Sequence, residues 1–404
     1  MRIDNFKKEG MFNLQAYKNL NLLDVKNEVL IKDAVIIVQE GRFKNIGQNI
    51  EIPKDAEVTD LQGKTVIPGL IDAHIHSMLD ASANPEKNLI EENDALTIIK
   101  AQKALANTLK AGITYVRDLG GAKYLDLGLR DAVNKGLIKG PRMQVAGKMI
   151  TMTGGHGHKM GREVDGTAEA RKAAREQLKA GVDVVKIMAT GGVMTEGVEP
   201  GSPQLTLEEI KAAVKEAHKA GRKTASHAQG TTGIQNAVKA GIDSIEHGIF
   251  LDQKTVDLMS TKNTFLVATL TAPYWIVEKG VENGIPEFAV KKSEKIIKSH
   301  CESFKLALDN NIKIAMGTDA GTPFNEHGKN TYELKLMVEA GMSSMQAIKA
   351  ATLGGAELLG IIEDFGSIET GKVADMVVLN GNPLDRIEDV FKVVSVFKAG
   401  KLVV

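Results

Sequence analysis

The strongest constraint on the fold is a regular alternation, between residues 66 and 321, of short apolar runs with amphipathic stretches. Apolar runs such as VVKIMA and TFLVATL are rich in β-branched residues, and helical stretches such as TLEEIKAAVKEAHKAG separate them. The pattern reads as eight strand–helix units, which favours an α/β chain folded as a (β/α)8 TIM barrel. An open doubly wound sheet is the alternative, but it usually has a Gly-rich phosphate turn after its first strand, and that turn is missing here.

Both ends of the chain differ from this middle part. The N-terminal segment contains β-like runs such as EVLIKDAVIIVQEG, and the C-terminal segment contains KVADMVVLNG and VFKVVSVFKAGKLVV, with turn residues between them. We therefore predict a small β-sandwich domain formed by both termini, residues 1–67 and 368–404. The predicted barrel spans residues 68–367.

Charge and cysteine content exclude several classes of partner and site. Lysine plus arginine and aspartate plus glutamate both number 51, so the formal net charge is zero. This balance lacks the basic excess that nucleic-acid and anionic-membrane binding require, so neither partner is expected. The single cysteine, Cys301, excludes an intramolecular disulfide and a cysteine-rich zinc site. No apolar secretory segment is visible near the start, so we expect a cytoplasmic protein.

The residues at the predicted strand ends are candidates for chemistry, because barrel active sites lie at the C-terminal ends of the strands. The run VIPGLIDAHIHS ends in two histidines separated by one isoleucine, and strand alternation places both on one face. The helical histidines His218 and His300 lie outside this pattern. The residues at or near the strand ends are His74, His76, His156, Lys186, His227, His247 and Asp319.

These residues also have ordinary structural explanations. A single histidine at a strand end is more often a hydrogen-bonded structural residue than a metal ligand. Lys186 differs, because an unpaired ammonium inside an apolar strand is costly. Its amine could be neutral after a pKa shift, or carbon dioxide could carboxylate it to give an anionic metal ligand. Together these nitrogen and oxygen donors are the ones that zinc prefers, so the set predicts a metal site.

The same motifs resemble those of a known superfamily. PGLIDAHIHS, the lysine of VVKIMA, SHA, IEHG and MGTDAG are similar in order and spacing to those of the amidohydrolases, and GKVADMVVLNGNPL resembles their C-terminal sheet segment. TGGHGHKMGREVDG and GTDAGTPFNEHGKNTYEL resemble the branch of metal-dependent dipeptidases and carboxypeptidases that are similar to Xaa-Pro, Xaa-Arg and Xaa-Lys peptidases. Imidazolonepropionase-like amidohydrolases also belong to that branch. The likeness covers nearly the whole chain.

This resemblance implies two divalent metal ions, with zinc expected, and a homo-oligomer. The first ion would be held by His74, His76 and Asp319, and the second by His227 and His247. Carboxylated Lys186 and a hydroxide would bridge the two ions. Such a pair lowers the pKa of bridging water and polarises a carbonyl group. Asp319 would take the proton of the hydroxide during attack and pass it to the leaving amine.

Other residues near the predicted strand ends are candidates for substrate binding. His156 resembles a carbonyl- or carboxylate-binding histidine, whereas His158 could be only a loop residue. Arg162 could pair with a substrate carboxylate or with a surface acid. Tyr274 and His327 could shape the mouth of the site. Phe250 stands where relatives often have tyrosine, which leaves the exact substrate open.

The sequence therefore predicts a metal-dependent hydrolase of the amide bond in a dipeptide or N-acyl amino acid, releasing the C-terminal amino acid. Cyclic amides, lactones and organophosphate esters are alternative substrates for the same metal centre. Deamination of a heterocycle is disfavoured, because deaminases of this superfamily generally lack the lysine found here at position 186. A non-catalytic scaffold is disfavoured because every candidate ligand is present. Side-chain preference is open, since Glu196 and Glu199 could form a negative pocket or simply be solvated.

Overall fold

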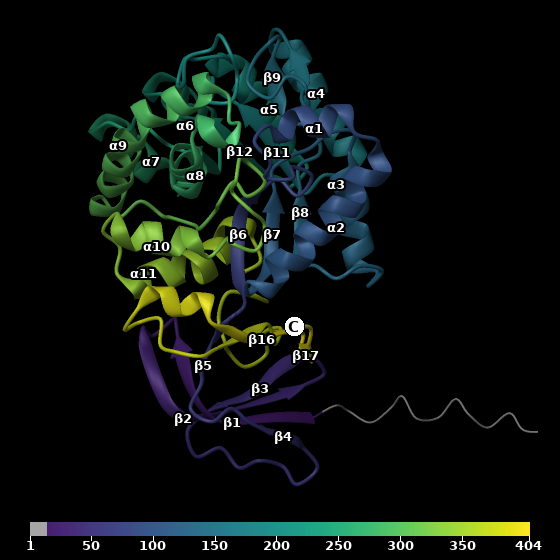
Figure 1. The fold of residues 1–404 in the computed structure, drawn as a ribbon, viewed down its shortest axis with the longest axis vertical. Coiled ribbons are helices and arrows are strands. Elements are labelled where there is room, and N and C mark those ends of the chain that lie inside the picture. Colours follow the sequence, from purple (N-terminus) through teal and green to yellow (C-terminus); the bar gives the residue numbers. More distant parts are fainter. Residues whose placement is uncertain (1–13) are drawn as a thin grey trace, which may run out of the picture.

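The computed structural model describes residues 14–404 and places strands from both chain ends in one mixed sheet (Figure 1). The sheet order is β17-β16-β15-β5-β1-β2-β3, with β4 paired to β1. Its strands are β1 (Leu14–Asp24), β2 (Val29–Gln39), β3 (Arg42–Gly47), β4 (Glu57–Asp60), β5 (Thr65–Pro68), β15 (Met376–Leu379), β16 (Val393–Lys398) and β17 (Lys401–Leu402).

The two chain ends therefore meet in a single sheet, and the predicted two-sheet sandwich is not confirmed. Residues 1–13 of the predicted small domain lie outside the described residues, and the domain boundaries at 67/68 and 367/368 stay predictions. One face of the sheet has its own core, because alternate residues of paired strands turn inward. Buried members of this core include Leu20, Leu22, Ile36, Met376 and Val378.

The middle of the chain forms parallel strands, as the alternation predicted. One three-stranded sheet contains β6 (Leu70–Ile75), β7 (Ile113–Asp118) and β8 (Arg142–Val145). A six-stranded sheet has the order β10-β9-β11-β12-β13-β14 and contains β9 (Ile150–Met152), β10 (Arg162–Val164), β11 (Val184–Met188), β12 (Lys223–Ala228), β13 (Ser244–His247) and β14 (Phe265–Val267). Every residue of β6, β11 and β13 is buried, as is usual for parallel strands covered on both faces.

The α/β character of the predicted barrel is confirmed, but its closure is not, because the parallel strands form two separate sheets. The run IKIAMGTDAG, which contains the motif MGTDAG, forms isolated bridges instead of a strand. Its backbone nevertheless contacts a strand on either side. The Leu266 amide of β14 donates to the Lys313 carbonyl at 2.9 Å, and the Ala73 amide of β6 donates to the Met316 carbonyl at 2.8 Å. Residues 313–320 thus lie between the two parallel sheets.

A glycine explains why the apolar run RMQVAGKMI forms two short strands, β8 and β9. Gly147 has φ +64°, in the left-handed region that other residues seldom adopt. A Cβ atom there would lie 2.8 Å from Cδ1 of Tyr124, so the ring leaves no room for a side chain. The chain bends at this point, and β9 pairs with β11 and β10.

The helices lie outside the parallel strands (Figure 1). Glycines end several of them: α4 and α6 are followed by Gly181 and Gly241, both with φ +93°. A capping box of Thr206 and Glu209 begins α5. The helices are α1 (Pro85–Glu91), α2 (Asp94–Lys110), α3 (Leu125–Asn134), α4 (Thr167–Ala180), α5 (Leu207–Lys219), α6 (Thr231–Ala240), α7 (Gln253–Lys262), α8 (Thr271–Lys279), α9 (Glu287–Asp309), α10 (Tyr332–Glu339), α11 (Ser344–Lys349) and α12 (Gly355–Leu359).

Three short turns complete the element list: η1 (Val281–Asn283), the π-helical turn η2 (Ala350–Gly354) and η3 (Ile387–Phe391). One large apolar core connects the parallel strands with the surrounding helices and fixes the positions of the strand ends. Within residues 14–404, no helix combines the length and the hydropathy needed to cross a membrane.

Candidate metal centre

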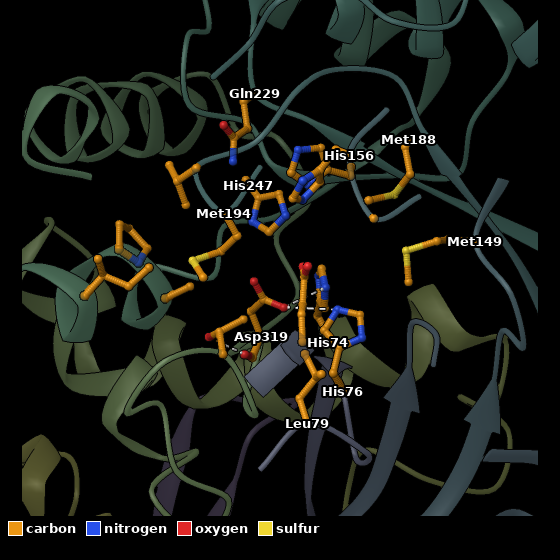
Figure 2. A pocket seen from close by; sticks show the side chains of 18 of the residues that line it. His74, His76, Leu79, Met149, His156, Met188, Met194, Gln229, His247 and Asp319 are labelled. Atoms are coloured by element: carbon orange, nitrogen blue, oxygen red, sulfur yellow. Dashed lines mark hydrogen bonds and ion pairs between the residues drawn. The ribbon is translucent and has the colours of Figure 1, made fainter. Parts of the chain in front are cut away.

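Three predicted ligands converge at the end of β6. Alternation along the strand puts His74 and His76 on one face, and Asp319 approaches them from the segment after residue 318 (Figure 2). The Oδ1 atom of Asp319 lies 3.3 Å from Nε2 of His74 and 3.2 Å from Nε2 of His76. One ligand atom from each of the three residues lies within 4.8 Å of the other two. This spacing fits a metal ion held by two imidazoles and a carboxylate.

Each of these histidines is held through its other ring nitrogen. Nδ1 of His74 lies 2.9 Å from Oε2 of Glu246, and Nδ1 of His76 lies 2.7 Å from the Gly120 carbonyl oxygen. Both partners are acceptors, so they favour a proton on Nδ1 and leave Nε2 as a lone-pair donor. Nε2 of His74 is buried and has no hydrogen-bond partner among the described residues, which a bound cation would explain.

A buried ion pair fixes the orientation of Glu246. Its Oε1 atom lies 2.9 Å from Nη2 of Arg117, and Nε of Arg117 donates to the Ala73 carbonyl at 2.6 Å. Both side chains are essentially inaccessible to solvent. Burial alone would raise the pKa of Glu246, but the Arg117 guanidinium and the His74 hydrogen bond hold this pKa well below its usual range. Glu246 is therefore a carboxylate that orients His74.

The other predicted metal histidines lie at the ends of neighbouring strands β12 and β13. The ring centroids of His227 and His247 are 4.6 Å apart, and that of His247 is 5.3 Å from His74. Nδ1 of His247 contacts the Thr269 hydroxyl at 2.7 Å, and Nε2 of His227 contacts the Gly191 carbonyl at 3.2 Å. Burial lowers the pKa of both imidazoles well below the usual value. They are therefore neutral, as metal ligands must be.

Lys186 lies within β11 among these residues and lines the same cavity. Its side chain is buried, and no described residue forms a hydrogen bond or ion pair with its amine. Burial lowers the pKa of the amine to about 8, although the charges of Glu246 and Asp319 act in the opposite direction. An amine with this pKa is partly neutral near physiological pH, which is the form that reacts with carbon dioxide.

Asp319 itself is ionised. Burial would raise the pKa of its carboxyl, but His74 and His76 hold that pKa well below the usual value. The residue has φ +59°, and its backbone amide donates to the His74 carbonyl at 2.7 Å. The unusual backbone conformation and this hydrogen bond both fix the carboxylate against the histidine pair.

His156 also reaches the cavity, from the loop after β9. Its Nδ1 atom lies 2.7 Å from the Thr195 hydroxyl, and its ring centroid is 4.3 Å from that of His227. A Cβ atom on Gly192 would lie 2.7 Å from the ring, so glycine is needed where the neighbouring loop passes. Burial lowers the pKa of His156 to about 4, and the neutral ring can donate one hydrogen bond and accept another.

The structure does not bring Arg162, Tyr274 or His327 into this cavity. Nε of Arg162 pairs with Glu176 at 2.9 Å, which agrees with the surface ion-pair interpretation. The Tyr274 hydroxyl contacts the Tyr332 hydroxyl at 3.0 Å in an aromatic group. Nε2 of His327 contacts the Leu79 carbonyl at 3.2 Å. None of the three lines the cavity, so their predicted substrate-binding roles lack geometric support.

Three further residues considered for substrate binding also lie outside the cavity at His74, His76 and Asp319. His158 bonds the Gly155 carbonyl of its own turn at 3.0 Å and lines a different cavity. Phe250 does not line the metal-site cavity, and its backbone amide donates to the Gln229 carbonyl at 2.8 Å. Glu196 lines that different cavity together with His158, and it does not line the cavity at His74, His76 and Asp319.

The structure adds cavity residues that the sequence analysis missed. His300 was expected to lie outside the site, but it lines the cavity from α9 and contacts the Ala268 carbonyl at 2.8 Å. Gln229 lies two residues after His227 in the run SHAQG, a spacing that places it on the same face of an extended chain. Glu86 enters from α1, and no strand-end pattern pointed to it. Oε1 of Gln229 is buried without a partner among the described residues.

We call the space at these residues the inner cavity. It measures about 80 Å³. His74, His76 and Asp319 lie together, and in this view His247 and His156 lie across from them (Figure 2). The remaining wall is largely apolar, and it includes Leu79, Met149, Met160, Met188, Met194 and Ile276. The arrangement combines a candidate metal cluster with a flexible apolar wall, because methionine side chains adapt their shape readily.

A sequence model of the Amidohydrolase family matches residues 65–403. An ochratoxinase from Aspergillus niger is 29% identical to this chain, over 92% of this chain and 83% of the ochratoxinase. An imidazolonepropionase from Pseudomonas fluorescens is 24% identical, over 86% of this chain and 88% of its own length.

Solved structures show the same fold. A Xaa-Pro dipeptidase crystallised with methionine bound in its active site is 35% identical, with a TM-score of 0.90, over 96% of this chain and 99% of its own. A prolidase complexed with N-methylphosphonate-L-proline is 31% identical, with a TM-score of 0.90 and the same coverage. These similarities extend beyond the site to nearly the whole chain.

Proposed function

As a member of the amidohydrolase family, this chain is a hydrolase, and we propose that it cleaves the amide bond of a dipeptide or N-acyl amino acid with two divalent metal ions. The observation that carries the proposal is the convergence of predicted ligands at one cavity. His74, His76 and Asp319 would hold one ion, His227 and His247 the other, and carboxylated Lys186 would join them. Zinc suits this donor set.

The donors support this assignment in three ways. Within residues 14–404, the buried Nε2 atom of His74 has no hydrogen-bond partner, and the Lys186 amine has none either. The imidazoles of His227 and His247 are neutral. Carboxylation would replace that isolated amine with an anionic oxygen donor. When bound, the two ions supply Lewis-acid polarisation of the substrate carbonyl and a lower pKa for water.

The chain's own side chains would manage the proton and the substrate. We propose that the Asp319 carboxylate accepts a proton from the attacking water and returns it to the leaving nitrogen, because an amine anion is a poor leaving group. His156 would hold the substrate carbonyl or carboxylate through Nε2, since Thr195 occupies Nδ1. Gln229 would contact a polar substrate group with its free Oε1 atom. Glu246 would keep His74 in its ligand orientation.

Two relatives support the dipeptide as substrate class. The dipeptidase structure contains methionine in its active site, and the prolidase is complexed with a phosphonate of proline. The inner cavity of this chain offers an apolar wall of methionines to such a ligand. We also propose a homo-oligomeric assembly, which size measurement in solution would test.

A direct assay separates this proposal from its alternatives. Zinc-loaded protein would be incubated with dipeptides and N-acetyl amino acids, and released amino acid and ammonia would be measured separately. Released amino acid supports amide hydrolysis of this class. Ammonia alone, or no product while metal stays bound, contradicts it and favours a cyclic amide, lactone or organophosphate ester.

A further inference from the structure

Glu86 is an acidic side chain at the junction of two cavities. It lies in the first turn of α1, after the N-cap residue Asn84. It lines the inner cavity and also a neighbouring outer cavity of about 470 Å³, whose other lining residues include Lys159 and Glu196. Gly157 and Met194 are shared by both cavities as well. Glu86 therefore belongs to the wall that the two cavities share.

No described residue forms a hydrogen bond or an ion pair with the Glu86 carboxylate, although it is partly buried. Burial raises the pKa of this carboxyl, while Lys159, His76 and His158 act in the opposite direction and Asp319 adds to the rise. Glu86 lines the same cavity as His76 and Asp319, so it lies in the neighbourhood of the candidate metal ligands. A partly desolvated carboxylate without a partner is unfavourable unless a cation reaches it.

The other residues that line the inner cavity indicate which ligand could bring a cation to Glu86. Besides histidines, the ionisable lining residues are Glu86, Lys186 and Asp319. Asp319 is already in contact with His74 and His76, so Glu86 is the acid that remains available. The surrounding wall is apolar and rich in methionine. A matching ligand has one positive charge next to an apolar side chain.

Helix geometry alone explains an acid in a first turn, because the helix dipole favours negative charge there. The helix dipole does not explain why Glu86 lines two cavities. Glu169 and Glu287 occupy the first turns of α4 and α9, and both are exposed. Glu287 pairs with Lys291 at 2.6 Å, and Glu169 lies 3.8 Å from Arg162. Glu86 is unlike them because it faces a cavity and has no such partner.

We propose that Glu86 binds the α-ammonium group of the substrate, so that the natural substrate is a dipeptide with a free N-terminus and an apolar first side chain. This inference rests on the proposed function and narrows it, because N-acyl amino acids lack that ammonium group. The charge-assisted hydrogen bond would contribute equally to the bound substrate and the transition state. Its loss therefore raises KM more than it lowers kcat.

Equilibrium binding tests this assignment without requiring turnover. Binding of L-methioninamide and of N-acetyl-L-methioninamide to zinc-loaded protein would be measured by calorimetry, for wild type, Glu86→Gln and the control Glu169→Gln. We expect wild type and the control to bind the free amine roughly 10- to 100-fold more tightly than the acetylated compound. In Glu86→Gln this preference should disappear. If Glu86→Gln still binds the free amine more tightly than the acetylated compound, the proposal is overturned. Binding of the amine to the metal ions would give that result.

Kinetics with L-Met-L-Ala and N-acetyl-L-Met-L-Ala separate this inference from the proposed function. Glu86→Gln should raise KM for the free dipeptide roughly 10- to 100-fold and leave kcat/KM for the acetylated form within about twofold. Equal hydrolysis of both compounds by wild type, unaffected by Glu86→Gln, overturns the role of Glu86 while amide hydrolysis stands. Binding preference without hydrolysis of either compound supports Glu86 and contradicts the proposed function.

Discussion

Nδ1 of His74 lies 2.9 Å from Oε2 of Glu246, a residue 172 positions later in the chain. The contact is buried, and it sets which ring nitrogen of His74 faces the cavity. Glu246 is held in turn by Arg117, so a strand-end carboxylate, an arginine of β7 and a metal-site histidine form one connected unit. The orientation of the candidate metal ligand His74 therefore depends on Glu246 and Arg117, which do not line the inner cavity themselves.

Glu246→Gln tests this dependence. The substituted amide keeps the shape of Glu246 but cannot accept from both His74 and Arg117 as a carboxylate does. We expect zinc affinity to fall about 10- to 100-fold, because lost orienting partners of metal ligands have effects of this size. Competition with a chelator of known affinity measures it, and Glu169→Gln is the matched control. Unchanged zinc affinity in Glu246→Gln would show that His74 is oriented without Glu246.

Asp319→Asn separates proton transfer from metal binding. The amide keeps one neutral oxygen beside His74 and His76 but cannot accept a proton. We expect kcat to fall about 10²- to 10⁴-fold, with an unchanged circular dichroism spectrum. Metal content measured on the same sample shows how much of the loss comes from a missing ion. Wild-type turnover in this variant would remove Asp319 from the role of proton carrier.

The buried carboxyl of Glu333, outside the candidate metal site, should make the free energy of unfolding depend on pH. It is fully buried and accepts hydrogen bonds of 2.8 Å from the amides of Leu270 and Thr271, yet burial raises the pKa of its carboxyl to about 7. A raised folded-state pKa gives stability that is fully present below the unfolded value and is lost as pH rises through 7. The term amounts to roughly 3 kcal/mol.

The measurement compares urea unfolding of wild type and Glu333→Gln between pH 4 and pH 9. Since glutamine does not titrate, the wild-type free energy of unfolding should decline relative to that of the variant as pH rises. Parallel pH profiles for the two proteins would mean that Glu333 has the same pKa in the folded and unfolded states.

His218→Ala is expected to leave activity unchanged, since His218 lies on α5 away from the inner cavity. The sequence analysis gave this histidine no role, and the structure adds a partly exposed ion pair of 2.8 Å with Asp243. Asp243 also pairs with Lys223 at 2.9 Å, so the Asp243 carboxylate keeps a partner when His218 is removed. We expect stability to fall by less than about 1 kcal/mol, measured by thermal unfolding. A loss of kcat/KM would contradict the position of the active site.

Strand periodicity carried much of the sequence-based prediction. The two-residue period of a strand placed His74 and His76 on one face. His227 and His247 were predicted because they lie near the ends of β12 and β13. No comparable sequence rule predicts the contacts of the residues between these strand ends. Arg162 begins β10 and Tyr274 lies on α8, and neither lines the inner cavity. Partners on other elements hold both side chains. Only three-dimensional packing reveals those partners.

Helical residues were missed for a related reason. His300 on α9 and Glu86 on α1 line the cavity, although neither follows a strand. Which helix passes over the strand ends depends on packing that a local pattern does not encode. The division of the run RMQVAGKMI depended likewise on contact between Gly147 and Tyr124, 23 positions earlier in the chain.

We propose that two metal ions, joined through Lys186, cleave an amide bond at this site. The most direct test titrates metal-free protein with zinc while amino-acid release from a dipeptide such as L-Met-L-Ala is followed. For wild type, release should rise to a plateau at two zinc ions per chain, and Lys186→Ala should bind one ion or fewer and stay inactive. Full activity at one ion per chain, or in Lys186→Ala, would contradict the account, as would no amino-acid release from any dipeptide at two ions per chain.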